Sequence, residues 1–338
     1  MGFRKFSLAG LGLNNWQNKK VLVTGATGLV GSFLVKTLLD SKAHVICLVR
    51  DWDPQSELIR SGLIKNTNVV SGELEDFSTV ERAIVEHEVD TVFHLGAQTI
   101  VGHAFRSPRA TFDTNIRGTY NLLDACRIHS DLVTSVVIAS SDKSYGDVSE
   151  LPYDETMPQK GRHPYDVSKS CTDLLASTYA HTYGVPLAIM RCGNIYGPGD
   201  LNYSRIIPGT IRSLYHHQAP VLRSNGLFLR DYVYVDDAVK AYLTLAENIT
   251  SPLVKGEAFN FGPAEPKTVL EVVTAIQILM GRSNIQPIIQ DVAHAEIRDQ
   301  FLDSSKAWRV LGLKPSRTLE EGLVETVTWY ENRLQVAA

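Results

Sequence analysis

A glycine-rich turn between a short apolar run and a helical pattern constrains this chain more than any other feature. Residues 21–24 read Val-Leu-Val-Thr, glycines follow with the spacing G-x-x-G-x-x-G, and apolar residues recur at helical spacing from 29 to 39. A side chain at these glycines would hold a pyrophosphate away from the helix N-terminus, where the partial positive charge lies. The order strand, glycine turn, helix therefore predicts a dinucleotide-binding unit. The residues placed around the pyrophosphate are Gly25, Thr27, Gly28, Leu29 and Gly31.

Apolar segments alternate with helical patterns along the first two thirds of the chain. Strand candidates span 21–24, 44–49, 68–70, 91–95, 135–139 and 187–190, and helical patterns cover 29–39, 79–86, 110–128 and 165–183. The strand candidates are apolar throughout rather than at every second position, which is typical of parallel strands covered on both faces. We therefore expect an α/β fold with a doubly wound parallel sheet.

The pattern changes after about residue 197, where prolines punctuate irregular segments. Residues 231–235 are strand-like, and Asp236 and Asp237 are expected to cap a helix that begins at Ala238. The run at 258–261 predicts a strand that returns to the first domain. The expected domains are a dinucleotide-binding domain at 18–197, with return segments near 236–263, and a smaller C-terminal α/β domain at 198–235 and 264–334.

The charge balance excludes two classes of partner. The 338 residues include 33 Lys and Arg against 37 Asp and Glu, a net charge of −4 without clusters of one sign. Nucleic acids and anionic membranes are bound by clustered basic residues, so we expect neither as a partner. The apolar runs also fall short of the roughly 18 residues that a membrane-spanning helix needs.

The N-terminal segment faintly resembles a signal peptide. Arg4 and Lys5 precede an apolar stretch at 6–13, but Gly10 and Gly12 break it and no small-residue cleavage site follows. We interpret it as a lead-in segment, with a signal peptide as the alternative.

Cysteine and histidine usage argues against disulfides and metals. Four cysteines lie far apart without a C-x-x-C pair, which fits a reduced, cytoplasmic setting. His216 and His217 have no acidic partner at ligand spacing, so an exposed helix face is the better interpretation. No metal site is expected.

The end of the second strand bears on which dinucleotide binds. An acidic residue there favours NAD, whereas an arginine accommodates the 2′-phosphate of NADP. Here Arg50 comes directly before Asp51, so NADP stays possible on this feature alone. The alternative is that Arg50 is a solvated residue after a strand.

A tyrosine and a lysine stand four residues apart on a predicted helix. Tyr165 and Lys169 therefore share one helix face. An ammonium near a phenol lowers the phenol's pKa from about 10 and makes it a base for a hydroxyl proton. Ser141, at the end of a predicted strand, can hydrogen-bond the same hydroxyl. Alone, the Tyr–Lys spacing is more often an exposed helical pair, and the glycine turn and the serine make catalysis the leading interpretation.

Together these motifs resemble the extended short-chain dehydrogenase/reductase superfamily, within it the NAD-dependent epimerases and dehydratases. The resemblance covers about 20 to 333 and rests on the glycine turn, His94 to Ala97, Asn115, Ser141 to Gly146, and Tyr165 to Lys169. It implies a Rossmann domain with tightly held NAD(P), a nucleotide-sugar in the C-terminal domain, and a homodimer formed through helices near 110–128 and 165–183. Extra apolar exposure on those helices follows from it. The further cofactor-binding residues it implies are Glu73, Leu74, Leu95, Ala97, Gln98 and Asn115.

The triplet Ser141-Asp142-Lys143 indicates the reaction. In sugar epimerases of this family small unreactive residues usually follow the catalytic Ser or Thr, whereas an acid–base pair follows it in 4,6-dehydratases. The Asp-Lys pair resembles the CDP-glucose 4,6-dehydratases and also the inverting UDP-GlcNAc 4,6-dehydratases. We expect Lys143, as a neutral amine, to be the base at C5 and Asp142, protonated, to be the acid at C6.

Three alternatives to this reaction stay open. Asp142 and Lys143 could simply pair in a polar turn. The chain could be a nucleotide-sugar 4-epimerase, which needs no acid–base pair, or a catalytically silent NAD-binding protein on the same fold.

In a dehydratase the hydride leaves and returns within one turnover, so a tightly held NAD suffices, and NAD is expected rather than NADP.

A nucleoside diphosphate needs fixed positive charge, which guanidinium groups supply. Arg230 matches the family's pyrophosphate-binding arginine and Asn194 its sugar- or phosphate-binding asparagine, with Arg205 and Arg298 as weaker matches. A surface arginine is the alternative interpretation of each arginine.

Overall fold

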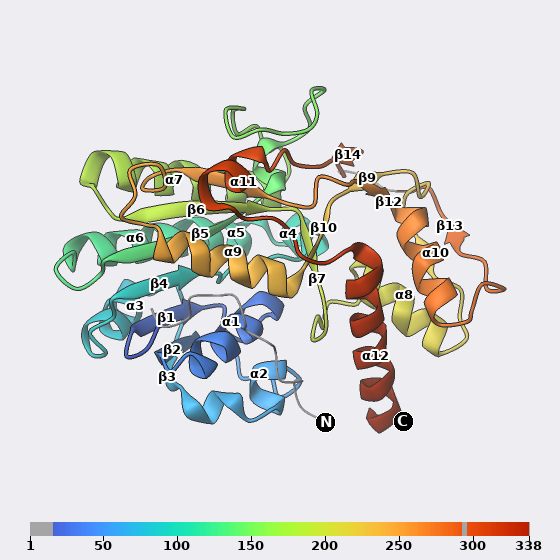
Figure 1. Ribbon diagram of the computed structural model, residues 1–338, viewed down its shortest axis with the longest axis horizontal. Coiled ribbons are helices and arrows are strands. Elements are labelled where there is room, and N and C mark those ends of the chain that lie inside the picture. The colour runs from blue at the N-terminus through green and yellow to red at the C-terminus, as the bar shows by residue number, and fades with distance from the viewer. Residues whose placement is uncertain (1–15, 293–295, 338) are drawn as a thin grey trace.

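The computed structural model describes residues 16–292 and 296–337, so the predicted lead-in segment at 1–15 lies outside the described residues. A seven-stranded sheet forms its centre, with the strand order β11-β6-β5-β4-β1-β2-β3 (Figure 1). All six neighbouring pairs are parallel. The strands are β1 Lys20–Thr24, β2 His44–Val49, β3 Asn68–Ser71, β4 Thr91–His94, β5 Ser135–Ser141, β6 Leu187–Cys192 and β11 Ala258–Phe261. The predicted Rossmann-like α/β fold is therefore confirmed.

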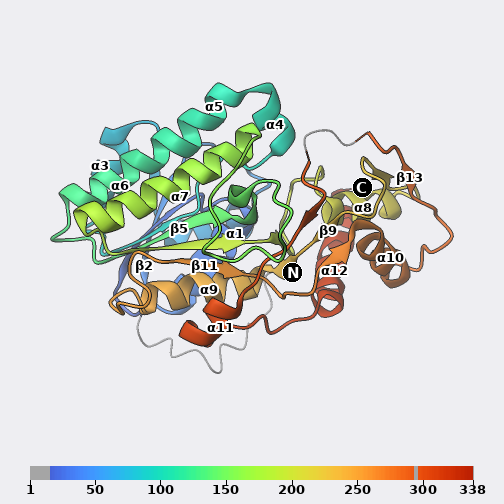
Figure 2. The same ribbon diagram turned by 90° about the horizontal axis from the view of Figure 1, so that it is seen from above.

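Helices cover both faces of the sheet, as Figure 2 shows. One face carries α3 Phe77–Val85, α6 Gly118–Ile128 and α7 Pro164–Tyr183, and the other carries α1 Leu29–Asp40, α9 Val235–Glu247 and α11 Ser305–Leu311. Successive strand residues point to opposite faces, so Leu22 packs with the first group of helices while Val21 and Val23 pack with the second. Double coverage explains why these strands are apolar at every position.

The predicted helix at 110–128 is interrupted. The chain forms α5 Pro108–Phe112, a π-helical turn at Asp113–Arg117, and then α6. Pro108 begins α5 because its missing N–H is not needed in a first turn. The π-helical turn, a feature that is frequent at functional sites, contains Asn115.

Asp236 and Asp237 do not cap the next helix, contrary to the prediction. β10 ends at Tyr234, and α9 begins at Val235. Both carboxylates therefore lie in the first turn of α9, where their negative charge interacts favourably with the helix dipole. Asp237 instead accepts hydrogen bonds from the backbone N–H groups of Ser316 and Arg317. It therefore fastens a later loop to α9.

The remaining elements lie beside the sheet, at the right of Figure 1. The helices there are α8 Ile206–Tyr215, α10 Val269–Leu279 and α12 Leu319–Ala337. Short strands form three small sheets: β7 Asn194–Tyr196 with β10 Tyr232–Tyr234, β8 Val221–Leu222 with β13 Ile288–Ile289, and β9 Leu229–Arg230 between β12 Lys267–Thr268 and β14 Asp299–Gln300. One hydrophobic cluster runs from the α1 and α9 face of the sheet into all three helices.

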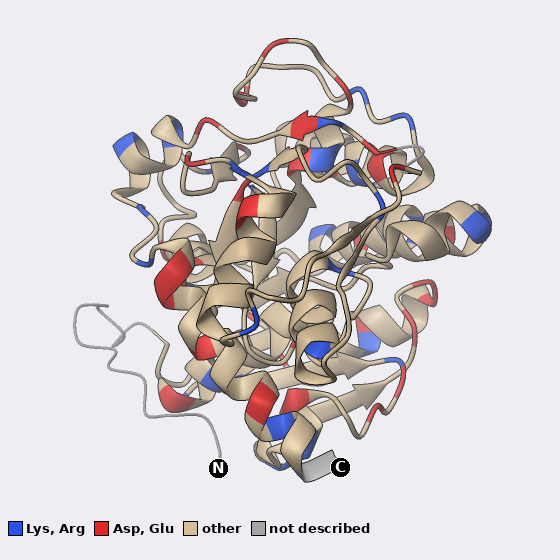
Figure 3. Ribbon diagram, turned by 90° about the vertical axis from the view of Figure 1, so that its right-hand side faces the viewer, with Lys and Arg blue, Asp and Glu red and all other residues tan. Residues whose placement is uncertain are grey.

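The charges on this side of the molecule are mixed. In Figure 3 basic and acidic segments alternate over the face rather than gathering by sign. Within the described residues, no helix combines the length and the apolar character needed to cross a bilayer.

Candidate active site

The glycine turn packs so closely that side chains at two of its glycines would collide with neighbouring backbone. Gly25 has a φ of +68°, and a Cβ on it would lie 2.8 Å from the backbone nitrogen of Gly96. A Cβ on Gly31 would overlap the carbonyl oxygen of Gly25. Gly28 precedes α1 without a side-chain hydrogen bond to the first turn. The bare backbone at the α1 N-terminus therefore fits the phosphates of a dinucleotide.

A buried network joins the carboxyl ends of β1 and β4 beside the glycine turn. The Thr24 hydroxyl lies 2.9 Å from Nδ1 of His94 and accepts a hydrogen bond of 3.0 Å from the backbone N–H of Gly96. Burial, together with the Lys169 ammonium, lowers the pKa of His94 to about 3. His94 is therefore neutral at ordinary pH and fixes the path of the chain into Leu95 and Ala97.

Asn115 makes three side-chain hydrogen bonds within the protein. Its side-chain oxygen accepts from the N–H of Gln98 at 2.7 Å, and its amide nitrogen donates to the carbonyl of Gln98 at 3.0 Å and to the Ser168 hydroxyl at 2.9 Å. These bonds give Asn115 a positioning role, and its contact with the cofactor stays a prediction. Asn115 holds the Gln98 loop against α7.

The residues expected near the adenosine differ in burial. The Leu74 side chain is buried and lies where Cβ atoms on Gly96 and Gly118 would strike it. Glu73, next to it in the chain, is partly exposed. Arg50 has a side chain 54% exposed, and its Nε lies 2.7 Å from Asp51. The structure thus places Arg50 on the surface at the end of β2, and its contact with the cofactor stays a prediction.

Ser141, Tyr165 and Lys169 come together at the end of β5. Ser141 is the last residue of the strand, and its hydroxyl lies close enough to the Tyr165 phenol to lower the pKa of Tyr165 slightly. The Lys169 ammonium lies one turn further along α7 and donates to the carbonyl of Ala139 at 2.8 Å. Three residues that are separate in the sequence therefore form one cluster.

The expected lowering of the Tyr165 pKa is not found. Burial raises the pKa of Tyr165, and the nearby Arg205 guanidinium and Ser141 hydroxyl oppose the effect of burial only in part. Burial also lowers the pKa of Lys169 to about 8, against the effect of Asp173. Desolvation outweighs the neighbouring groups of opposite charge in both cases, because Tyr165 and Lys169 are enclosed by protein.

Asp142 and Lys143 do not pair with each other. A 3₁₀ turn at Asp142–Tyr145 follows β5, and Oδ1 of Asp142 accepts a hydrogen bond of 2.8 Å from the Ser141 hydroxyl. Oδ2 of Asp142 is buried without a partner among the described residues. The Lys143 amine instead donates to Oε1 of Gln300 at 3.0 Å. Burial raises the pKa of Asp142, although Lys143 and Ser141 oppose it.

The four predicted substrate residues are divided between the site and the surface. Arg230 is buried near Asp142, and its guanidinium donates to the carbonyls of Leu229, Ile297 and Arg298. Arg205 pairs with Asp200 at 3.0 Å, close enough to Tyr165 to affect its pKa.

Asn194 donates to the carbonyl of Asp231 at 3.4 Å, next to Arg230. Arg298 is 74% exposed and lies 3.8 Å from Asp299. The structure therefore brings Arg205, Arg230 and Asn194 toward the cluster at the end of β5 and leaves Arg298 at the surface.

Two residues at this site were missed by the sequence reasoning. Asp231 is fully buried, and burial together with Asp142 raises its pKa to about 7 against a hydrogen bond from Leu302. It follows Arg230 directly, so the same motif could have indicated it. Gln300 lies 157 positions from Lys143, and no local signal could have joined them.

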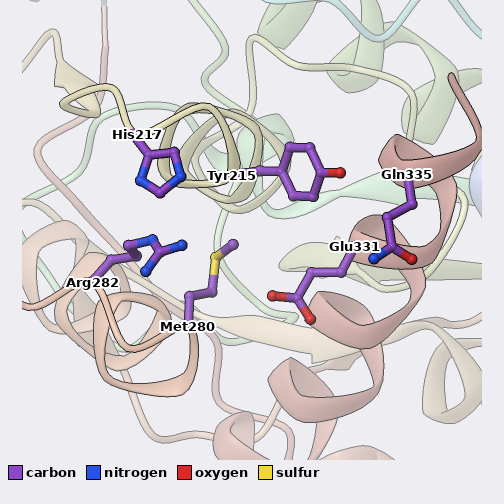
Figure 4. A pocket seen from close by; sticks show the side chains of 6 residues that line it. All are labelled: Tyr215, His217, Met280, Arg282, Glu331 and Gln335. Carbon is purple, nitrogen blue, oxygen red and sulfur yellow. The ribbon is translucent and has the colours of Figure 1, made fainter. Parts of the chain in front are cut away.

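A separate cavity of about 440 Å³ opens between α8, α10 and α12 (Figure 4). It is lined by Tyr215, His217, Met280, Arg282, Glu331 and Gln335. None of the predicted site residues lines it. Across the described ranges, no group of three or more His, Cys, Asp or Glu side chains is arranged to hold a metal.

Known proteins share this fold and this arrangement of motifs. The model of the NAD dependent epimerase/dehydratase family matches residues 21–262. The chain belongs to this family. It is 31% identical to the CDP-glucose 4,6-dehydratase of Salmonella typhimurium over 334 residues, covering 94% of this chain and 92% of that protein. It is 30% identical to the dTDP-glucose 4,6-dehydratase 1 of Escherichia coli over 344 residues, covering 92% of each.

Solved structures of family members agree with the fold. The UDP-glucose 4-epimerase of Thermotoga maritima, solved with UDP-glucose, superposes with a TM-score of 0.84 at 28% identity, covering 93% of this chain and 99% of that one. The dTDP-glucose 4,6-dehydratase of Bacillus anthracis, solved with NAD, gives 0.83 at 27% identity, covering 94% and 98%. Dehydratases and epimerases therefore share this architecture.

Proposed function

We propose that the protein is an NAD-dependent nucleotide-sugar 4,6-dehydratase that converts CDP-glucose to CDP-4-keto-6-deoxyglucose. The separation of Asp142 from Lys143 carries this proposal. A buried carboxyl with a raised pKa suits a general acid, and an amine held by a neutral amide suits a base. An ion pair between Asp142 and Lys143 would have kept the carboxyl deprotonated and the amine protonated, so that neither could act as acid or base.

The oxidation half of the reaction is assigned to the cluster at the end of β5. Tyr165 takes the proton of the C4 hydroxyl, Ser141 hydrogen-bonds that hydroxyl, and Lys169 stabilises the phenolate. NAD, bound at the glycine turn, would accept the hydride from C4 and return it to C6. The resulting C4 ketone makes the proton on C5 acidic.

The elimination half is assigned to the 3₁₀ turn. Lys143 removes the C5 proton, and Asp142 protonates the C6 hydroxyl as it leaves as water. Lys143 then returns a proton to C5 when the hydride reaches C6. The proton that Tyr165 gained from C4 balances the one that Asp142 gave, so one molecule of water is lost in each turnover.

NAD fits the cradle of bare backbone at Gly25, Gly28 and Gly31. We assign its pyrophosphate to this turn with Thr27 and Leu29, and its remaining contacts to Glu73, Leu74, Leu95, Ala97 and Gln98. Asp51, which lies 2.7 Å from Nε of Arg50 just after β2, supports NAD over NADP, because an acidic residue there suits the ribose hydroxyls of NAD.

The nucleotide-sugar is assigned to the segments at 198–235 and 264–334. Arg205 and Asn194 are the proposed contacts to its sugar and phosphates, and Arg230 supplies positive charge beside them. The resemblance to relatives acting on CDP-glucose and dTDP-glucose supports a nucleoside diphosphate hexose as the substrate class.

The proposal predicts loss of water from a nucleotide-sugar. Purified protein is incubated with CDP-, dTDP-, UDP- and GDP-glucose, and the products are analysed by mass spectrometry. We expect CDP-glucose to lose one water fastest. If no nucleotide-sugar loses water while the protein binds NAD, the proposed activity is wrong.

A nucleotide-sugar 4-epimerase is the second candidate function. The fold match to the Thermotoga maritima epimerase favours it. An epimerase would return a product of unchanged mass, and Lys143 would then be dispensable.

We also propose a homodimer and a cytoplasmic location. Leu174 and Tyr183 on α7 are 56% and 55% exposed, and Tyr120 and Ile128 on α6 are also exposed. Figure 2 places α6 and α7 side by side on the outer side of the sheet. Such apolar exposure suits a helix-to-helix interface between two copies.

The proposed cytoplasmic location is supported by the four cysteines, which are unpaired, as in a reduced compartment.

A further inference from the structure

Gln300 is held in place by contacts on both sides of its strand. β14 pairs in parallel with β9, so Gln300 lies opposite Arg230. The Arg230 guanidinium donates to the carbonyl of Arg298 at 2.7 Å, and Oδ2 of Asp231 accepts from the N–H of Leu302 at 2.7 Å. Tyr153 bridges to Leu302 on the other side. The backbone around Gln300 is therefore fixed before any substrate arrives.

The Gln300 side chain is fully buried and touches the catalytic turn. Its Oε1 accepts from the Lys143 amine at 3.0 Å, and its Nε2 has no hydrogen-bond partner among the described residues. A flipped amide would aim N–H at the amine. If Lys143 were protonated, two hydrogen-bond donors would then face each other. If Lys143 were neutral, the amide N–H would occupy the nitrogen lone pair that a base needs. The observed orientation leaves the nitrogen lone pair of a neutral Lys143 amine free.

We propose that Gln300 is a positioning residue that holds the Lys143 amine through a neutral acceptor, and so keeps it able to remove the C5 proton. This inference rests on the proposed dehydratase function and names a residue that the family resemblance did not indicate. The unpartnered Nε2 supports it, because a buried donor without an acceptor is costly and an oxygen of a bound nucleotide-sugar would satisfy it.

The charged groups around Lys143 explain why an uncharged side chain at position 300 is important for keeping the Lys143 amine neutral. The charged groups come from three elements: Asp142 on the same turn, Asp166 on α7 and Arg230 on β9. Burial raises the pKa of both Asp142 and Asp166, so both carboxyls hold protons more readily than exposed ones do. A carboxylate in place of Gln300 would be a new anion 3.0 Å from the amine and would stabilise its protonated form.

The first test is the pH profile of water loss in Gln300→Glu. The acidic limb, where Lys143 must lose its proton, is expected to move up by about one pH unit or more, with about tenfold less activity at neutral pH and recovery in alkali. Gln277→Glu is the matched control, since Gln277 is buried in α10 and donates to the carbonyl of Ile285 away from the site. A Gln300→Glu profile that superposes on the parent's overturns the inference.

A second variant covers the case in which Gln300→Glu does not fold. Gln300→Leu keeps the volume but removes the acceptor, so the rate should fall about tenfold or more at every pH without a shift of the acidic limb. Full activity in Gln300→Leu also overturns the inference.

An assay without substrate separates this inference from the proposed function. Lysines are labelled with limiting acetic anhydride, which reacts with the neutral amine, and Lys143 labelling is quantified by mass spectrometry relative to exposed Lys65. Gln300→Glu should lower Lys143 labelling about tenfold, whereas Gln277→Glu should not change it. If Gln300→Glu lowers Lys143 labelling but the parent protein dehydrates no nucleotide-sugar, the proposed dehydratase function is wrong and the contact between Gln300 and Lys143 is supported. Unchanged labelling overturns the Gln300 inference even if the parent dehydrates CDP-glucose.

Discussion

At the scale of single residues, burial decides the protonation chemistry of the candidate site. It raises the pKa of Tyr165 and of Asp142, and it lowers the pKa of Lys169. For Asp142 the neutral form is the one that a general acid needs. For Tyr165 burial works against the phenolate, so positive charge such as that of the Lys169 ammonium has to offset desolvation before the base can act.

Asp231 gives a residue-scale prediction about stability and pH. Burial raises its pKa from 3.8 to about 7, so between these pH values the folded state holds a proton that the unfolded state has lost. The stability that this proton confers is fully present at low pH and is lost as pH rises toward 7. Asp231→Asn removes that dependence while keeping an acceptor for Leu302.

We therefore expect the stability of Asp231→Asn relative to the parent to increase from pH 4.5 to 7.5, by about 4 kcal/mol at most. Urea unfolding followed by circular dichroism at both pH values measures it. A difference between variant and parent that is the same at both pH values would contradict this assignment.

The sequence indicated some of these residues and not others, for a physical reason. Ser141, Tyr165 and Lys169 were predictable because a strand end and a helical turn fix them locally. The partner of Lys143 was not, because Gln300 reaches it from 157 positions away. The raised pKa of Tyr165 was also missed, because spacing shows that Lys169 shares its helix face but not how far both are buried.

At the scale of elements, the glycine turn joins β1 to α1 with no room for side chains. Gly31→Ala would drive a Cβ into the carbonyl of Gly25, displacing the backbone that would bind phosphate. We expect NAD affinity to fall about tenfold or more by calorimetric titration. Gly102→Ala is the control, because nothing lies within 4 Å of a Cβ at Gly102. Parent-like affinity in Gly31→Ala would show that NAD binds elsewhere.

Element boundaries were predictable where the local pattern decides them. The strand predicted at 44–49 has the bounds of β2, because its apolar run ends sharply at Arg50. The π-helical turn before α6 was not predictable, because the apolar spacing continues through it while the bonds of Asn115 to Gln98 and Ser168 are tertiary. The start of α9 at Val235 was also not predictable. Asp237 does not cap the helix but accepts a hydrogen bond from Ser316, which is distant in the sequence.

At the scale of the whole molecule, the exposed apolar positions on α6 and α7 predict self-association. Leu174→Asp places a charge in the proposed interface and should convert a dimer to a monomer, as measured by light scattering after gel filtration. Ile278→Asp is the control, because Ile278 is as exposed but lies on α10. A parent that is monomeric at micromolar concentration, or a Leu174→Asp variant that stays dimeric, would refute the proposed interface.

The reaction itself is tested most directly by running it in heavy water. With CDP-glucose in D₂O, the account predicts a product that has lost one water and gained one deuterium at C5, because Lys143 returns a solvent-exchanged proton there. The hydrogen that left C4 should appear at C6 undiluted by deuterium, and Lys143→Ala should abolish the deuterium gain. A product of unchanged mass without deuterium at C5, or full deuterium gain in Lys143→Ala, would contradict the account.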